Sequence, residues 1–224
     1  MGTMPRLPRV QFPGAYYHVY NRGVEQRPIF LDDMDRKMFL KLLSEETQQS
    51  YLKLFAYCLM ENHYHLFLQI TKPNLNLILQ ALQGRYAQYL NARYDRVGAL
   101  FQGRYKSRWV NEDQYALTLL RYIHRNPLDA NLVKNLEDYR WSSYLSYVGK
   151  LPRWNWLETS WVLRQFSPDS ALALELFRLF HQTPSSPAEH KILAQLRKPL
   201  GNPKGSDPFA AHTEQPRITV STTR

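Results

Sequence analysis

The strongest constraint on the fold of this 224-residue chain is a pair of strand-like stretches joined by only two residues. Residues 52–60 and 63–70 are rich in apolar and aromatic residues, and Glu61 and Asn62 connect them. A connection this short joins neighbouring antiparallel strands. The sequence therefore predicts an antiparallel hairpin.

Apolar spacing elsewhere predicts the other elements. They are a strand over residues 16–21, a helix from Asp32 or Asp33 to about residue 47, a long amphipathic helix over 75–94, a strand over 101–110 and a helix over about 114–124. Asn126 and Pro127 should end the last helix, because a residue before proline disfavours the helical conformation. The order β-α-β-β-α-β-α predicts an α+β fold with the ferredoxin-like split βαβ arrangement around a central antiparallel sheet.

The composition of the chain divides it into three parts. Residues 1–150 are predicted to form the main domain. Residues 151–183 are predicted to form a helical extension, with a helix near 170–181, which packs on the main domain through its tryptophans. These are Trp154, Trp156 and Trp161. Residues 184–224 are rich in Pro, Ser, Thr and Gly, which predicts a largely disordered tail.

The charge of the chain favours a polyanionic partner. It has 29 Lys and Arg residues against 19 Asp and Glu residues, a formal net charge of +10. Residues 85–108 hold six of the cations and one acidic residue, interleaved with aromatic residues. Cations for phosphates and rings for unpaired bases are the components of a single-strand binding groove. The alternative is a solvated helix face beside aromatic residues of the core.

Composition also excludes several classes of protein. No apolar stretch is long enough to span a membrane, and the N-terminal residues lack the apolar segment of a secretory signal. The single cysteine, Cys58, excludes an intrachain disulfide and a cysteine-rich zinc site. We therefore expect a cytoplasmic protein with no membrane partner.

The sharpest candidate for chemistry is the sequence His63-Tyr64-His65 in the second strand of the hairpin. Residues two apart on a strand project from the same face, so the two imidazoles lie side by side while Tyr64 points away. Paired imidazoles are common metal ligands, yet two histidines can also share a half-exposed face without binding anything. A metal site therefore requires a third ligand from elsewhere in the chain.

The helix after the fourth strand offers that ligand. Tyr122 and Asn126 are four residues apart and share one helix face. The amide oxygen of Asn126 is an acceptable ligand for a hard divalent cation, and Tyr122 beside it could attack a bound phosphodiester. Tyr115 is the nearest competing nucleophile, but Leu119, four residues on, cannot bind metal. His124 points away from Tyr122 and Asn126 at helical pitch, and an ordinary packing role for Tyr122 stays open.

Five motifs resemble those of the single-tyrosine HUH transposases and, within them, the REP-associated tyrosine transposases. They are YYHVYNRG at 16–23, YCLMENHYHLFL at 57–68, LFQGRYKS at 100–107, YIHRNP at 122–127 and YRWSSY at 139–144. They occur in the family's order and cover about residues 13–150.

The resemblance implies that His63, His65 and Asn126 bind Mg²⁺ or Mn²⁺ and that Tyr122 is the nucleophile. It also implies a monomer that cleaves and rejoins single-stranded, hairpin-forming DNA from REP-like palindromes through a 5′-phosphotyrosine intermediate. The charge cluster adds four candidate DNA-binding residues, which are Arg85, Arg104, Lys106 and Arg108. Two alternatives stay open: a non-catalytic, sequence-specific nucleic-acid-binding protein on the same fold, and a metal-dependent hydrolase that uses water.

Overall fold

The computed structural model describes residues 11–49, 52–110, 113–152 and 154–183, together with Pro187 and Glu189. The elements in chain order are β1 (Tyr16–Arg22), η1 (Val24–Gln26), α1 (Asp33–Gln49), β2 (Leu52–Leu59), β3 (His63–Ile70), α2 (Leu75–Arg93), β4 (Lys106–Val110), α3 (Asp113–Asp129), η2 (Leu136–Asp138), α4 (Tyr144–Tyr147), α5 (Ser160–Arg164) and α6 (Ser170–Gln182).

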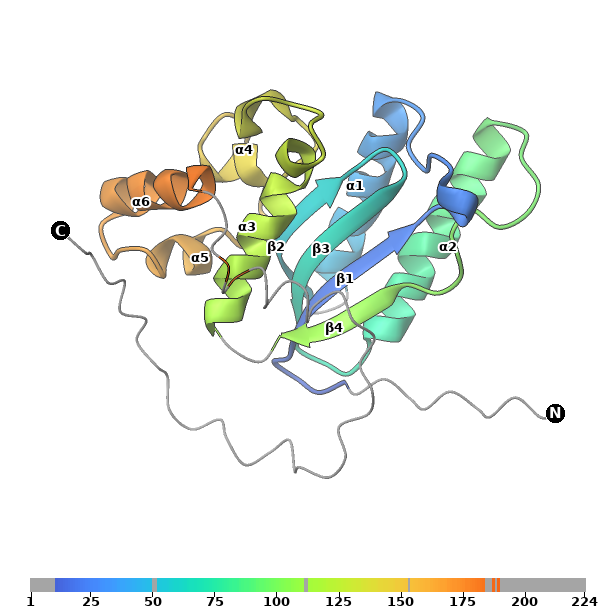
Figure 1. Ribbon diagram of the computed structural model, residues 1–224. Coiled ribbons are helices and arrows are strands. Elements are labelled where there is room, and N and C mark those ends of the chain that lie inside the picture. The colour runs from blue at the N-terminus through green and yellow to red at the C-terminus, as the bar shows by residue number, and fades with distance from the viewer. Residues whose placement is uncertain are drawn as a thin grey trace.

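The four strands form one antiparallel sheet in the order β2-β3-β1-β4. The hairpin of β2 and β3 is present, and β1 lies between β3 and β4 (Figure 1). This is the strand order of the ferredoxin-like split βαβ arrangement, in which the first and third strands are the central neighbours. The predicted α+β fold is therefore confirmed.

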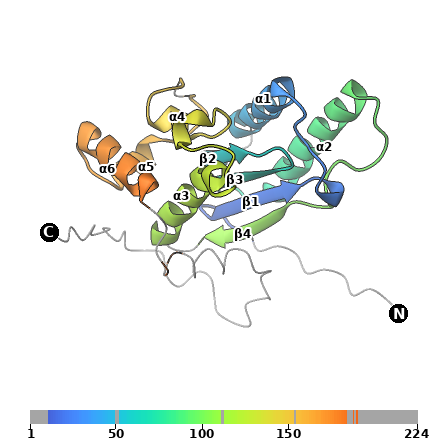
Figure 2. The same ribbon diagram turned by 45° about the horizontal axis from the view of Figure 1, so that its top comes forward.

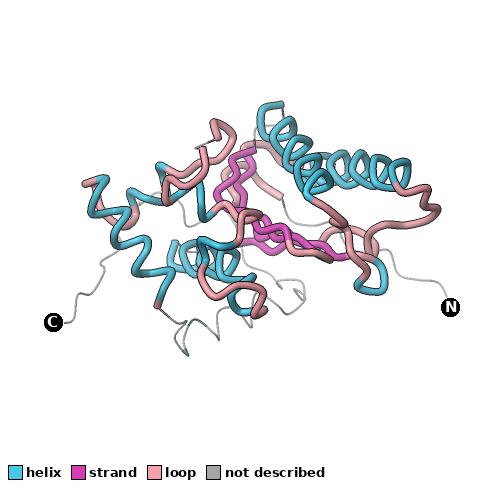
Figure 3. Tube along the Cα trace, turned by 90° about the horizontal axis from the view of Figure 1, so that it is seen from above, coloured by secondary structure: helices cyan, strands magenta, loops and turns pink. Residues whose placement is uncertain are grey.

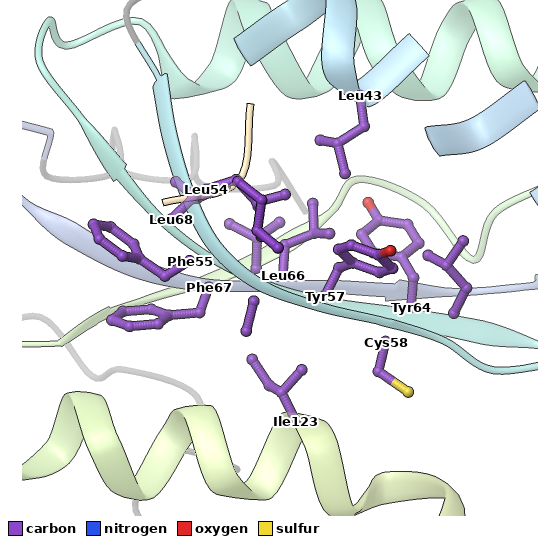
Figure 4. Close-up of a cluster of buried hydrophobic side chains, with 14 of the residues drawn as sticks. Leu43, Leu54, Phe55, Tyr57, Cys58, Tyr64, Leu66, Phe67, Leu68 and Ile123 are labelled. Atoms are coloured by element: carbon purple, nitrogen blue, oxygen red, sulfur yellow. The ribbon is translucent and has the colours of Figure 1, made fainter. Parts of the chain in front are cut away.

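Helices cover both faces of the sheet. Seen from above, the strands lie between two groups of helices (Figure 3). Helices α1 and α2 pack on one face, where the Phe39 ring lies 4.9 Å from that of Tyr64, and α3 packs on the other face against β2 and β3. Leu43 points to the sheet from α1 and Ile123 points to it from α3 (Figure 4). Because side chains alternate along the strands, each face of the sheet presents apolar side chains to the helices that cover it.

Two element boundaries differ from those predicted. The fourth strand begins at Lys106 and not at Phe101, because Gly103 adopts a φ of +85° that interrupts an extended strand. Helix α3 continues past Pro127 to Asp129. Pro127 is buried, and a bond from Ala130 N–H to the Asn126 carbonyl, 3.0 Å long, closes a further turn after it. Proline cannot donate a backbone hydrogen bond, and the packing of its ring together with the bond from Ala130 offsets the energetic cost of this loss.

The C-terminal extension covers the outer edge of the sheet at β2 (Figure 2). A single bridge joins Leu54 to Leu157 of the extension, and a second bridge joins Cys58 to Ser142, which precedes the extension. The Trp156 ring stacks on Tyr57 at 5.9 Å, and the Trp161 ring contacts Phe55 at 5.2 Å. The predicted packing of the extension through these tryptophans is confirmed, while Trp154 is 42% exposed. A covered edge strand cannot pair with another chain.

A buried chain of hydrogen bonds fastens α6 to α3 and β2. The Phe177 carbonyl can only accept, so His181 Nδ1–H donates to it over 2.8 Å. His181 Nε2 therefore accepts from His124 Nδ1 at 2.9 Å. His124 Nε2 in turn accepts from the Ser143 hydroxyl at 2.7 Å, and Ser143 Oγ accepts from Tyr57 N–H at 3.0 Å. Ser143 Oγ also lies 3.2 Å from the Tyr57 carbonyl, which is a second acceptor for its hydroxyl proton. Through these bonds α6 holds the side of α3 that faces away from the sheet histidines.

The division into a main domain (1–150), an extension (151–183) and a tail (184–224) stays a prediction. Apart from Pro187 and Glu189, the tail lies outside the described residues. None of the helices in the described part of the chain is long and apolar enough to cross a membrane.

We predict that replacing His181 lowers both the stability of the protein and its sensitivity to acid. Burial lowers the pKa of His181 from 6.5 to about 3, with Arg121 and Arg125 adding to the effect. In an acid titration, the folded protein therefore binds this proton at a lower pH than the unfolded chain does. The contribution of His181 to the free energy of unfolding is complete above a pH of about 6.5. As the pH falls from about 6.5 to about 3, this free energy decreases by up to ~1.4 kcal/mol per pH unit.

In the variant His181→Leu, the free energy of unfolding should depend less on pH between about 6.5 and 3. Urea titrations at several pH values measure this dependence. At neutral pH the variant should be less stable by about 1–3 kcal/mol, because His124 Nδ1–H stays buried without an acceptor. The exposed neighbour provides the control, as Gln182→Ala should change neither quantity. An unchanged pH slope in His181→Leu would show that this histidine is not held neutral.

Candidate active site

The two histidines of β3 project from the face of the sheet that α3 covers. The ring centroids of His63 and His65 are 5.1 Å apart, and their planes are nearly perpendicular at 85°. His65 is 7% exposed, and His63 is half-buried. The alternation on the strand therefore brings the imidazoles together as predicted.

Helix α3 brings Tyr122 and Asn126 to these histidines. The Tyr122 ring lies 5.5 Å from the His65 ring in an edge-on arrangement. Asn126 Nδ2 donates to the Tyr122 carbonyl over 2.9 Å, and the Asn126 side chain hydrogen-bonds His63. The competing Tyr115 lies about two helical turns earlier. The four residues selected from the sequence thus meet in one place.

The hydrogen bonds of His63 define which ring nitrogen faces Asn126. Asn62 Nδ2 donates to the Gln26 carbonyl over 3.1 Å, so Asn62 Oδ1 faces His63 Nδ1 at 2.7 Å and accepts its proton. The remaining nitrogen, Nε2, is then the partner of Asn126. Asn126 Nδ2 gives one of its two hydrogens to the Tyr122 carbonyl, which leaves the second hydrogen and Oδ1 of the amide for contacts with His63.

This arrangement suits a cation between His63 and Asn126. A neutral imidazole has one proton, which Asn62 already accepts, so His63 Nε2 has a lone pair that it can donate to a cation, and Asn126 Oδ1 has lone pairs that can join it. Burial lowers the pKa of His63, the hydrogen bond with Asn126 acts in the opposite direction, and the charge of Arg22 adds a smaller lowering effect. The described residues hold no group of three or more His, Cys, Asp or Glu side chains able to bind a metal. The third donor here is an amide.

The loop after β1 forms hydrogen bonds with the turn between β2 and β3, which directly precedes His63. Gly23 N–H donates to the Asn62 carbonyl over 2.9 Å, and Ile29 N–H donates to the Glu61 carbonyl over 2.9 Å. A Cβ atom on Gly23 would lie 2.1 Å from the Arg27 carbonyl oxygen, so only glycine fits at this point. The YYHVYNRG motif therefore supports the metal-ligand candidates through its backbone.

His18 is a site residue that the sequence interpretation missed. It is 3% exposed, and its Nε2 lies 2.9 Å from His65 Nδ1. Its ring also contacts Tyr122 edge-on at 6.1 Å. Burial, with a contribution from the charge of Arg108, lowers the pKa of His18 to about 3. His18 is therefore a neutral hydrogen-bond partner that orients His65.

Two of the candidate DNA-binding residues lie near this cluster and are open to solvent. Lys106 is exposed on β4, and its Nζ lies 5.8 Å from the centre of the Tyr20 ring. Tyr20 lies directly opposite both Lys106 and His65 in the sheet. Arg104 is exposed in the preceding loop. A cation and a half-buried ring thus adjoin the histidines on the same face.

The other two candidates have different surroundings. Arg85 lies on α2, on the opposite face of the sheet, and pairs with Glu45 at 2.6 Å and with Glu46 at 3.7 Å. Arg108 is on the α3 side of β4, directly opposite His18, but is only 6% exposed. The basic segment 85–108 is therefore not one continuous groove.

Comparisons with solved structures agree with this fold. A structure of a REP-associated tyrosine transposase bound to a REP hairpin matches with a TM-score of 0.57 at 14% identity, over 66% of this chain and 89% of that chain. At this identity the likeness shows the fold alone.

Two weaker matches carry no argument. A transposase candidate from Deinococcus radiodurans R1 has a TM-score of 0.38 at 20% identity, over 54% of this chain and 97% of that chain. The tRNA(His) guanylyltransferase from Saccharomyces cerevisiae has a TM-score of 0.39 at 10% identity, over 84% of this chain and 80% of that chain. No curated protein sequence matches this chain.

The family comparison covers the candidate site itself. The model of IS200-like transposases matches residues 11–126, more than half of the chain. This range begins before β1 and ends at Asn126, so it contains both histidines of β3 and Tyr122. The chain belongs to the family of IS200-like transposases.

Proposed function

We propose that this transposase cleaves and rejoins single-stranded DNA through a covalent bond to Tyr122. The observation that carries the proposal is the position of Tyr122, whose ring lies 5.5 Å from that of His65. On the same face of α3, Asn126 hydrogen-bonds His63. A nucleophile next to three potential metal ligands is the arrangement that phosphodiester transfer requires.

The substrate we propose is hairpin-forming DNA from REP-like palindromes. The similar REP-associated tyrosine transposase is described as bound to a REP hairpin. The net charge of +10 and the exposed cations Arg104 and Lys106 beside the site support a nucleic-acid partner. Cellular DNA as substrate also supports a cytoplasmic protein.

His63, His65 and Asn126 would hold the divalent metal, which we propose to be Mg²⁺ or Mn²⁺. Two imidazole nitrogens and one amide oxygen form a donor set of intermediate hardness that leaves room for water and a phosphate oxygen. When bound, such an ion polarises the scissile phosphate and neutralises the charge that develops during transfer.

The residues of the chain perform the transfer in one reversible step. Tyr122 Oη forms a bond to the phosphorus atom, and the bond between phosphorus and the 3′-oxygen breaks. The phenolic proton is balanced by the proton that the 3′-hydroxyl gains, so the products are a 5′-phosphotyrosine and a free 3′-end. Attack by a 3′-hydroxyl reverses the step, and no ATP is required because the bond energy is retained.

The arrangement supports a monomer as the active unit. Tyr122, His63, His65 and Asn126 meet within one chain. No second copy is needed to complete the cluster. We further propose residues 1–150 as the catalytic domain and 151–183 as an extension that braces α3 through His181.

We expect Tyr122→Phe to abolish the covalent protein–DNA adduct while hairpin binding survives. The variant lacks the attacking oxygen but keeps the ring, so cleavage should fall by at least about a thousandfold. A labelled hairpin oligonucleotide and a denaturing gel measure the adduct, and a gel shift measures binding. Tyr115→Phe, on the same helix, is the matched control and should retain both.

The outcomes of this experiment separate the three functions. Normal cleavage by Tyr122→Phe would favour a water-using hydrolase, with Tyr122 as a packing residue. Binding without cleavage by the wild-type protein in Mg²⁺ and in Mn²⁺ would favour the non-catalytic nucleic-acid-binding protein.

Metal affinity should depend on the Asn126 side chain. We expect Asn126→Ala to weaken Mn²⁺ binding by at least about tenfold, because one of three protein ligands is lost. Asn126→Asp should restore it, since a carboxylate oxygen can take the same place. Titration calorimetry measures this without DNA. Tyr122→Phe is the control and should bind Mn²⁺ normally; equal affinities of wild type and Asn126→Ala would remove Asn126 from the ligand set.

The salt dependence of hairpin binding should distinguish the exposed cations from the paired ones. Lys106→Gln should reduce the slope of log Kd against log salt concentration by about one, because one phosphate contact is lost. Arg85→Gln removes the same charge from the other face, where Glu45 already pairs with it, and should leave the slope unchanged. The reverse pattern would move the DNA to the α2 side of the sheet.

A further inference from the structure

Arg108 carries a charge that no acidic residue of the described chain pairs with. The residue is 6% exposed, and the structure gives its side chain no hydrogen bond or ion pair with the residues that it describes. None of its nitrogen atoms is among the fully buried side-chain atoms without a partner, so the guanidinium reaches the surface. A guanidinium at the surface without an acidic partner in the described chain can bind an anion supplied from outside.

A second group without a partner lies beside Arg108. His18, directly opposite Arg108 in the sheet, has its Nδ1 buried with no hydrogen-bond partner. The two side chains share the α3 side of the sheet, and the charge of Arg108 acts on the His18 ring. Among the described residues, two polar groups of neighbouring strands therefore lack partners in the same region.

The hydrogen bond between His18 and His65 determines whether this nitrogen donates. If His65 binds the cation through Nε2, its ring proton lies on Nδ1 and is donated to His18 Nε2, 2.9 Å away. The proton of His18 then lies on its own Nδ1. His18 Nδ1 thus becomes a second donor beside the Arg108 guanidinium.

We propose that Arg108 and the Nδ1–H group of His18 form an anion site that binds a phosphodiester group of the DNA strand next to Tyr122. This assignment rests on the proposed function, because it needs both a DNA substrate and a His65 that binds metal. It pairs Arg108 with the buried donor of His18, whereas Lys106 is an exposed cation.

The position of the site suits one phosphate of a bound strand. The His18 ring lies 6.1 Å from the nucleophile ring of Tyr122. Lys106, on the same face of β4 two residues from Arg108, is exposed. The donors therefore adjoin both the reacting group and an exposed cation. A guanidinium can also offer two parallel N–H bonds to phosphate oxygens.

The test neutralises one phosphate of the hairpin at a time. Each phosphodiester is replaced in turn by an uncharged methylphosphonate, and Kd is measured for the wild-type protein and for Arg108→Gln. For wild type we expect a loss of about tenfold or more at one position near the cleaved bond. Arg108→Gln should bind the natural hairpin more weakly by a similar factor and be insensitive to replacement at that position. Lys37→Gln, exposed on α1, is the control for loss of one charge and should show the wild-type pattern.

Thermal melting without DNA supplies a second readout. Arg108→Gln should melt at about the wild-type temperature, because no ion pair with an acidic residue of the described chain is lost. A residue with a merely structural role would lower the melting temperature instead.

Three results would overturn the proposal. These are the wild-type pattern of sensitive phosphates in Arg108→Gln, equal sensitivity at every phosphate in the wild-type protein, and stabilisation of wild type by inorganic phosphate without any position-specific effect in the hairpin. Failure of the wild-type protein to bind the hairpin at all would instead refute the proposed function, and with it the premise of this site.

Discussion

The packing of α3 on the sheet is the interaction on which the rest of the candidate site depends. Ile123 is fully buried and points from α3 to the sheet near Cys58 (Figure 4). Successive residues of a helix are about 100° apart, so fixing Ile123 toward the sheet places its two neighbours on opposite flanks. Tyr122 then reaches His65, and His124 faces the extension. One apolar contact sets the direction of both polar side chains.

The extension holds α3 from its other flank. His124 bonds His181, and Arg125 donates to the His181 carbonyl over 2.8 Å at the end of α6. Arg121 lies over the Phe180 ring at 4.3 Å. The helix with the nucleophile is thus fixed between the sheet and α6. Because a misplacement of about 1 Å can cost a reaction about a hundredfold, a brace far from the chemistry can still matter for it.

The sequence predicted those parts of the site that depend on local geometry. His63 and His65 share a face because strands have a period of two, and Tyr122 and Asn126 share one because helices place residues four apart together. His18 has no such local signal. Its partner His65 is 47 residues away, and their contact depends on the register that sets Tyr20 opposite His65. Register between distant strands follows from tertiary packing, which spacing within one strand does not contain.

The basic residues show a similar limit to what can be predicted from the sequence. Arg85 and Arg93 belong to the cluster that suggested a DNA groove, yet Arg85 pairs with Glu45 of α1, and Arg93 pairs with carboxylates at the start of α1 and directly before it. Tyr86, from the same cluster, is fully buried. A count of charges along the chain cannot separate a cation with an internal partner from one without, because the partners come from other elements. The fold makes this distinction. Lys106 is exposed, and Arg108 lies opposite His18 with no acidic partner among the residues that the structure describes. A cation without an internal partner keeps its charge available for an anion, which is the role proposed for Arg108.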